Sequence, residues 1–209
     1  IISEADTIEI TSTLSHVQCA DSLNGEIIVV GIGGTGTLVP TWTSSNPAFI
    51  DPSTISLSGL DSGNYFLGLV DDNGCVYDTS FSISKPNSII ANANVSSISC
   101  HGTANAVIEL NTSGGSGSYN WAWNGPGGYS STEDTILNLD TGSYQLNIVD
   151  LSGCSIDTLI EIIQPDELSI IANINNVSCF NDTTGNIKII LSGGSGNYTY
   201  DWDNDGVGD

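Results

Sequence analysis

The sequence has almost no positive charge. Its 209 residues include 24 Asp and Glu but only two cationic side chains, both lysines, so the formal net charge is −22. Nucleic-acid binding requires a clustered basic face that contacts phosphates, and binding to anionic lipid headgroups requires basic residues as well. The composition therefore excludes nucleic acid as a partner and argues against attachment to a membrane surface.

The chain also lacks methionine and long apolar runs. No stretch reaches the roughly 18 apolar residues of a membrane-spanning helix, so we expect no membrane insertion. With no Met and no signal peptide, we expect the sequence to be a piece of a longer mature chain. Hydrophobic residues nevertheless make up 39% of the sequence, more than in a disordered acidic segment, so the chain is expected to fold.

Helical periodicity is missing too. No window of about a dozen residues keeps an apolar stripe at helical spacing without a glycine. The apolar residues instead form short blocks rich in β-branched side chains, such as 26–30, 106–110 and 144–149, bounded by Gly, Asn, Asp, Ser or Pro. Such blocks are typical of β-strands, and the sequence predicts an all-β protein.

The sequence repeats itself with a period of about 80 residues. Three Gly-Gly-Thr/Ser-Gly runs are each preceded by a Cys and followed by a Trp at constant spacing. The runs begin at Gly33, Gly114 and Gly193, the cysteines are Cys19, Cys100 and Cys179, and the tryptophans are Trp42, Trp123 and Trp202. Later motifs recur as well, at 60–65 and 139–144, at 70–75 and 149–154, and at Pro86 and Pro165. We therefore predict repeats at 1–86 and 87–165, and the first half of a third at 166–209.

Each full repeat contains about seven short strand patterns separated by turn signals. A strand, a tight turn and a partner strand follow one another at 65–83, which is typical of a hairpin. Seven strands in this length predict a small immunoglobulin-like β-sandwich. Trp42, Trp123 and Trp202 lie mid-repeat, where a sandwich places a large residue between its sheets, so we predict that they are core anchors.

These motifs resemble a known family. The series Cys, Gly-Gly-Ser-Gly-x-Tyr-x-x-x-Trp, Leu-Asp-Thr-Gly-x-Tyr, Val-x-Asp-x-x-Gly-Cys and Gln-Pro is similar to the SprB-type repeat of very long surface adhesins in gliding bacteria. The resemblance implies an extracellular filament exported by type IX secretion and used in adhesion, and in some members in gliding motility. It implies neighbouring repeats of the same chain as contacts, and surface polysaccharide or other cell-surface proteins as partners. The first repeat departs from the pattern, because 38–40 reads Leu-Val-Pro where the others have Tyr119 and Tyr198.

The five cysteines fit an exported, oxidising environment. We expect the disulfides Cys19–Cys75 and Cys100–Cys154, with the partner of Cys179 past the end, because a repeat should be self-sufficient. Each bond would close a loop of about 55 residues and contribute roughly 4 kcal/mol. The alternative joins repeats through Cys75–Cys100 and Cys154–Cys179, since the first turn and the last hairpin of a standard sandwich lie at opposite ends. Free buried thiols are a further alternative, and metal ligation is disfavoured because no Cys-x-x-Cys occurs.

An acidic run closes the sequence from Asp201 to Asp209. Carboxylates at alternate positions followed by glycine can turn several oxygens onto one calcium ion, and the run resembles the calcium loops of thrombospondin type 3 repeats. The predicted ligands are the side chains of Asp201, Asp203, Asp205 and Asp209 and the carbonyl of Val207. The alternative is a solvated Asn-Asp-Gly turn. The first two repeats lack the run, so calcium would not join the repeats in general.

The remaining motifs favour a non-catalytic protein. The Gly-Gly-Ser-Gly runs lack the Lys-Ser or Lys-Thr of a phosphate loop and are predicted to be flexible turns. No Ser-His-Asp or Cys-His set recurs, so no enzyme activity is expected. Asp-Thr/Ser-aliphatic triplets resemble the O-glycosylation signal of such bacteria. The acceptor residues would be Thr7, Ser22, Thr135 and Thr158.

The leading hypothesis for function is a structural segment whose tandem sandwiches extend a binding tip from the cell. A second hypothesis is a glycan-binding module that uses exposed Tyr119, Trp121 or Tyr129. A third is an accessory region of a secreted carbohydrate-active enzyme.

Overall fold

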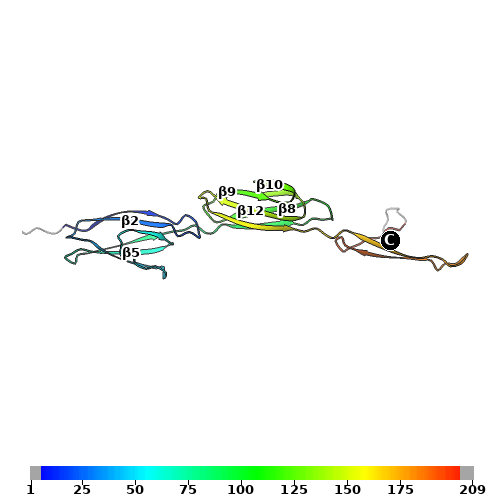
Figure 1. Cartoon of the computed structure of the whole chain (residues 1–209), viewed down its shortest axis with the longest axis horizontal. Coiled ribbons are helices and arrows are strands. Elements are labelled where there is room, and N and C mark those ends of the chain that lie inside the picture. Colours follow the sequence, from blue (N-terminus) through cyan, green and yellow to red (C-terminus); the bar gives the residue numbers. More distant parts are fainter. Residues whose placement is uncertain (1–5, 203–209) are drawn as a thin grey trace, which may run out of the picture. The chain divides into compact units, whose positions relative to one another are not determined.

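The computed structural model describes residues 6–202 and is built almost wholly from antiparallel strands (Figure 1). Two sandwiches come first, and a single hairpin follows them. Among the described residues the only helical element is the 3-10 turn η1, Pro126–Gly128. No helix within residues 6–202 has the length and apolar character needed to cross a bilayer.

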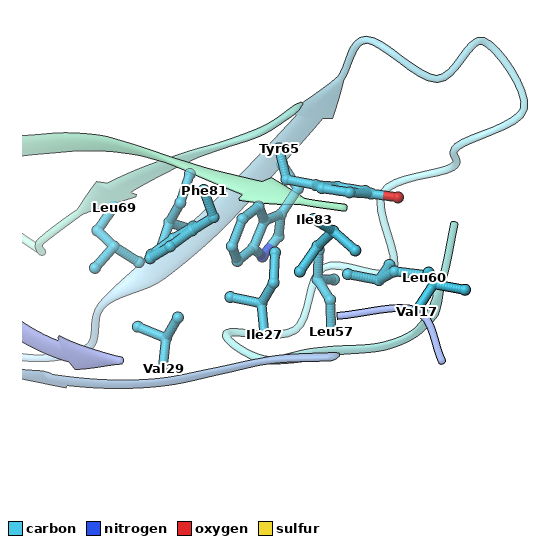
Figure 2. Packing of buried hydrophobic residues seen from close by; sticks show 11 residues of the cluster. Val17, Ile27, Val29, Leu57, Leu60, Tyr65, Leu69, Phe81 and Ile83 are labelled. Atoms are coloured by element: carbon cyan, nitrogen blue, oxygen red, sulfur yellow. The ribbon is translucent and has the colours of Figure 1, made fainter. Parts of the chain in front are cut away.

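The first sandwich contains six strands in two sheets. The strands β1 (Glu9–Ser15), β2 (Gly25–Ile32) and β4 (Leu57–Leu60) form a sheet in the order β1-β2-β4, and β3 (Val39–Ser44), β5 (Gly63–Val70) and β6 (Val76–Ile83) form a sheet in the order β3-β5-β6. Alternate side chains of β2 and β5 point inward, including Ile27, Leu67 and Leu69, as expected for strands with one buried face. Figure 2 shows the resulting core, with Ile27 and Leu69 among its side chains. Trp42 belongs to this core and is 2% exposed.

The second sandwich repeats this plan. The strands β7 (Ile90–Ser96), β8 (Ala106–Ser113) and β11 (Thr135–Leu139) form one sheet, and β9 (Tyr119–Asn124), β10 (Ser130–Ser131), β12 (Gly142–Asp150) and β13 (Ser155–Ile162) form the other. Trp123 is 1% exposed, and its indole Nε1 donates a hydrogen bond to the carbonyl of Glu133 at 2.9 Å. In the first sandwich Trp42 Nε1 donates in the same way to the carbonyl of Thr54 at 2.8 Å. The prediction of an all-β protein with immunoglobulin-like sandwich repeats is therefore confirmed.

The third segment is the hairpin of β14 (Ser169–Asn175) and β15 (Asn186–Ser192), paired from Ser169 with Ser192 to Asn175 with Asn186. The prediction that Trp202 is a buried anchor is wrong, because its side chain is 55% exposed. In the two sandwiches the tryptophan lies on β3 or β9, which pairs in the same sheet with β5 and β6 or with β12 and β13. Within residues 6–202 the third segment has no such sheet.

By internal contacts the chain divides into two compact units. The first comprises Ile1–Ile90, Thr112–Tyr119 and Val149–Ser155, and the second comprises Ala91–Asn111, Asn120–Ile148 and Ile156–Asp209. The tip of the β12–β13 hairpin and the nearby glycine-rich loop therefore belong to the same unit as the first sandwich.

Candidate functional site

The β12–β13 hairpin turns around one buried carboxylate, that of Asp150. Its Oδ1 accepts hydrogen bonds from the backbone N–H of Ser152 and of Cys154, both at 2.9 Å. The Asp150 N–H in turn donates to the carbonyl of Cys154 at 2.9 Å, and the Gly153 N–H donates to the carbonyl of Asp150 at 3.0 Å. The carboxylate thereby holds the turn that ends in Cys154.

The other carboxylate oxygen of Asp150 reaches the glycine-rich loop 114–117. It accepts a hydrogen bond from the backbone N–H of Ser116 at 2.8 Å. Gly115 lies directly against it with φ +58°, and a Cβ there would stand 2.5 Å from Asp150 Oδ2, so the loop requires glycine at this position. The N–H donors of Ser116 and Cys154 stabilise the ionised form and lower the pKa of Asp150 below its ordinary value of 3.8.

The first repeat contains the same arrangement, built on Asp71. We call it the aspartate clamp: a buried carboxylate that accepts N–H groups from both a hairpin turn and a glycine-rich loop. Its carboxylate accepts from the N–H groups of Thr35 at 2.8 Å, Asn73 at 3.0 Å and Cys75 at 2.8 Å. The N–H donors, that of Cys75 first, lower the pKa of Asp71. The prediction that the Gly-Gly-x-Gly runs are flexible turns is therefore wrong for these two repeats, because a buried aspartate fastens each run to a hairpin. The recurrence of Val-Asp-x-x-Gly-Cys in register with the glycine run is the sequence signal of the clamp.

The clamped hairpin presents Cys154 to the first repeat. The structure bonds Cys19 to Cys154, with 5.6 Å between their Cα atoms. Beside the bond, the side chain of Gln18 donates from Nε2 to the carbonyl of Ser152 at 2.6 Å. The remaining cysteines are exposed thiols: Cys75, Cys100 and Cys179.

This pairing corrects the expected bonds Cys19–Cys75 and Cys100–Cys154. The Val17 N–H donates to the carbonyl of Ser84 at 3.0 Å, so the Cys19 turn lies where β6 ends. Cys75 precedes the start of β6, and eight strand residues at about 3.3 Å each separate the two ends by roughly 26 Å. A disulfide requires Cα atoms closer than about 7 Å. The alternative bond Cys154–Cys179 is not formed either, because Cys154 is already bonded to Cys19.

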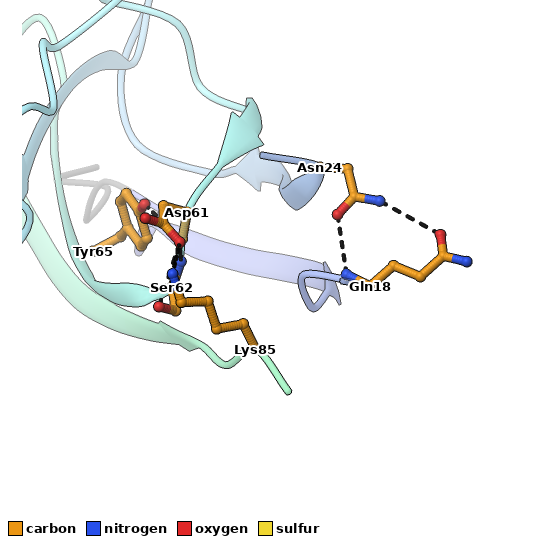
Figure 3. A network of polar contacts seen from close by, with 6 residues as sticks. All are labelled: Gln18, Asn24, Asp61, Ser62, Tyr65 and Lys85. Atoms are coloured by element: carbon orange, nitrogen blue, oxygen red, sulfur yellow. Dashed lines mark hydrogen bonds and ion pairs between the residues drawn. The ribbon is translucent and has the colours of Figure 1, made fainter. Parts of the chain in front are cut away.

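Polar contacts fix the end of the first sandwich that carries Cys19 (Figure 3). The Gln18 N–H donates to Asn24 Oδ1 at 3.0 Å and shapes the Cys19 turn. Lys85 Nζ lies 3.0 Å from Asp61 Oδ1, and this hydrogen bond lowers the pKa of Asp61. The hydroxyl of Tyr65 donates to the carbonyl of Asp61 at 2.8 Å.

The other sites predicted from the sequence are less organised. Asp201 is exposed, and the remaining predicted calcium ligands Asp203, Asp205, Val207 and Asp209 lie outside the described residues. Within 6–202 no group of three or more His, Cys, Asp or Glu side chains is arranged to hold a metal ion. Of the predicted glycosylation acceptors, Thr7 is exposed, whereas Ser22, Thr135 and Thr158 are half-buried.

The aromatic residues considered for glycan stacking take part in the fold. The hydroxyl of Tyr119 donates to the carbonyl of Gly114 at 2.7 Å. The ring of Tyr129 lies edge-on to that of Tyr144 with 5.5 Å between centroids. Trp121 is half-buried and shares a face of β9 with the buried Trp123. All three side chains are half-buried.

Comparison with known proteins finds a similar repeat in two stretches of the chain. The sequence model described as "SprB repeat" matches residues 92–128 and 171–207. Each match contains the Cys, the Gly-Gly-Ser-Gly run and the Trp of one repeat. No curated protein matches the chain.

Two similar solved structures contain immunoglobulin domains. One is described as the structure of the amphioxus IgVJ-C2 molecule, with 13% identity, 77% of this chain and 98% of that chain covered, and a TM-score of 0.30. The other is the crystal structure of Dpr2 Ig1-Ig2 in complex with DIP-Theta Ig1-Ig3, with 12% identity, coverage of 82% and 70%, and a TM-score of 0.30. Likeness at this level carries no argument about function.

Proposed function

We propose, from the premise that this chain carries SprB repeats, that it is a structural segment of a large cell-surface adhesin. Its sandwiches extend a binding tip from the cell and carry the pulling force that adhesion, and in some cells gliding, places on the filament. The observation that supports this role is the disulfide between Cys19 of the first repeat and Cys154 of the second. Such a bond also suits export, by type IX secretion as in the family, into an oxidising extracellular space.

The disulfide changes the path that a pulling force takes. A pull on the two ends of the chain reaches Cys19, crosses the sulfur–sulfur bond and continues from Cys154. The residues between them include strands β2 to β12 and carry no tension. Tension can therefore unravel only the segments outside this loop, and most of both cores is protected.

The buried carboxylates support a structural role rather than a catalytic one. A general base must accept a proton from a substrate. The carboxylates of Asp71 and Asp150 each accept three backbone N–H groups, and these donors hold their pKa values low. Both groups are thus engaged in fixing the fold.

Single-molecule stretching between the two termini tests the proposal. The bond spans a sequence separation of 135 residues. At about 3.3–3.6 Å per extended residue, the oxidised chain should reach a contour length roughly 450–490 Å shorter than the reduced chain. The matched control is Cys19→Ser/Cys154→Ser, which should show the longer length with or without reductant. Equal lengths for oxidised and reduced wild type would contradict the proposed mechanical role of the disulfide.

A further inference from the structure

The third segment reproduces half of the clamped site. Its glycine-rich loop 193–196 is held as in the second repeat, because the Gly194 N–H donates to the carbonyl of Asp166 at 2.8 Å and the Tyr198 hydroxyl donates to that of Gly193 at 2.6 Å. The corresponding bonds of the second repeat run from Gly115 to Asn87 at 2.8 Å and from Tyr119 to Gly114 at 2.7 Å. The third loop is therefore ready to receive a carboxylate.

The Cys100 turn is likewise a copy of the Cys19 turn. The Ser99 N–H donates to Asn105 Oδ1 at 3.3 Å, and the Thr103 N–H donates to the carbonyl of Cys100 at 3.2 Å. In the first repeat the same two bonds run from Gln18 to Asn24 and from Ser22 to Cys19, both at 3.0 Å. Cys19 is bonded in this frame, whereas Cys100 is an exposed thiol.

The copied loop and the copied turn border one pocket in the second compact unit. Its lining includes Cys100, Gly194, Ser195 and Tyr198. A Cβ on Gly34 or Gly115 would lie 3.2 Å or 2.5 Å from the side chain of the clamping aspartate, but a Cβ on Gly194 would meet nothing nearer than Leu168 at 3.5 Å. Within residues 6–202 the Ser195 N–H accordingly has no carboxylate partner, unlike Thr35 and Ser116.

The apolar face beside this pocket is exposed, although the equivalent face of the second repeat is buried. Four positions that are at most 8% exposed in the second repeat are 53–59% exposed in the third segment. They are Ile89, Ile98, Ile108 and Trp123 in the second repeat, and Leu168, Val177, Ile187 and Trp202 in the third. In the second repeat β12 pairs with β9 in one sheet, and its side chains Tyr144, Leu146 and Ile148 are all buried.

We propose that the third segment is an acceptor site for a closing hairpin of the SprB-repeat type, with the motif Val-Asp-x-x-Gly-Cys. The hairpin aspartate accepts the Ser195 N–H, the apolar side chains cover Trp202 and its neighbours, and the hairpin cysteine forms a disulfide with Cys100. This bond repeats the Cys19–Cys154 connection one repeat further along. The inference is independent of the mechanical role proposed above, because it concerns which group the site binds.

The bond forms by thiol–disulfide exchange with a hairpin whose cysteine is already in a mixed disulfide. The Cys100 thiol loses its proton, and the resulting thiolate attacks the hairpin sulfur. The new sulfur–sulfur bond forms as the old one breaks, and the leaving thiolate takes up a proton. No net oxidation occurs in this step.

The test uses the full chain and a synthetic peptide with the sequence of residues 142–162, its cysteine capped by glutathione. Binding at the acceptor site raises the effective thiol concentration to the millimolar range, so at about 10 µM peptide Cys100 should react roughly 100-fold faster than Cys75 or Cys179. Peptide mapping without reductant measures how much of the synthetic peptide is bonded to each of the three exposed cysteines. Replacing the aspartate equivalent to Asp150 in the peptide by alanine should remove the preference for Cys100.

A second measurement does not depend on the covalent step. The peptide with serine in place of its cysteine should shift the fluorescence of the exposed Trp202 to shorter wavelength, and a Trp202→Phe chain should lack this shift. Equal modification of the three exposed thiols, or an unchanged Trp202 signal at saturating peptide, would overturn the proposal.

Discussion

Removal of the disulfide should destabilise the second sandwich. In Cys19→Ser/Cys154→Ser the second sandwich can unfold without a covalent tie to the first. In the wild type the disulfide closes the unfolded chain of the second sandwich into a loop. The loop runs from the region of Ser84, which lies beside the Cys19 turn, to Cys154 and contains roughly 70 residues.

The size of the effect follows from this loop. Closure of roughly 70 residues restricts the unfolded chain by about 4 kcal/mol at 25 °C in the chain-entropy model. For a domain of this size, each kcal/mol shifts the melting temperature by roughly 4–8 °C. The variant should therefore melt roughly 15–30 °C lower in the transition of the second sandwich, as followed by differential scanning calorimetry.

The matched control removes two cysteines at equivalent positions of the repeat. Cys75→Ser/Cys100→Ser replaces exposed thiols and should leave both transitions within about 2 °C of wild type, as expected for surface substitutions. Equal, small shifts in the two double variants would refute the reasoning. Recovery of a Cys19–Cys75 or Cys100–Cys154 peptide without reductant would refute the pairing directly.

Two further predictions concern the core and the clamp. Trp42→Ala and Trp123→Ala should each cost about 3–5 kcal/mol of unfolding free energy in urea titrations, whereas Trp202→Ala should cost clearly less because its side chain is 55% exposed; equal costs would contradict the burial pattern. Because folding lowers the pKa of Asp71 and Asp150, their stabilisation is complete above the unfolded-state pKa of about 3.9 and is lost as the pH falls through the lower folded-state pKa. Asp150→Asn should therefore unfold more easily at pH 7 and lose part of the wild-type pH dependence below about pH 4, and an unchanged dependence would contradict the clamp.

Residue spacing predicts the repeat and the burial of Trp42 and Trp123, but it does not predict the disulfide. Strand direction is the reason. Cys19 follows β1 and Cys75 follows β5, so simple alternation of strand direction would bring both to one end of the sandwich. However, β3 and β4 both run toward the Cys19 end, since β3 ends at Ser44 opposite Tyr65 and β4 ends at Leu60 opposite Gly25. This pair of equally directed strands moves Cys75 to the far end. The order of strands in the fold contains that information, whereas the spacing of cysteines does not.

The aspartate clamp could not be separated from the general acidity of the chain by composition. Asp71 and Asp150 are two of 24 acidic residues, and most of the others are solvated. What distinguishes the pair is their place at the end of a strand: Asp71 directly follows β5, and Asp150 is the last residue of β12. Each carboxylate accepts N–H groups of the turn that comes next, and a glycine-rich loop from an earlier part of the repeat approaches its second oxygen. That approach is a property of the folded repeat.

The clamp and the disulfide are best understood together. A cysteine at a hairpin tip would ordinarily be mobile, and ordering it during bond formation would cost conformational entropy. Here Asp150 accepts the N–H of Cys154 and of Ser152 and also holds the neighbouring loop, so the thiol is positioned before the bond forms. Preorganisation of this kind favours one partner over other exposed thiols. In the second repeat the glycine pair, the buried aspartate and the hairpin cysteine thus act together in joining this repeat to the first.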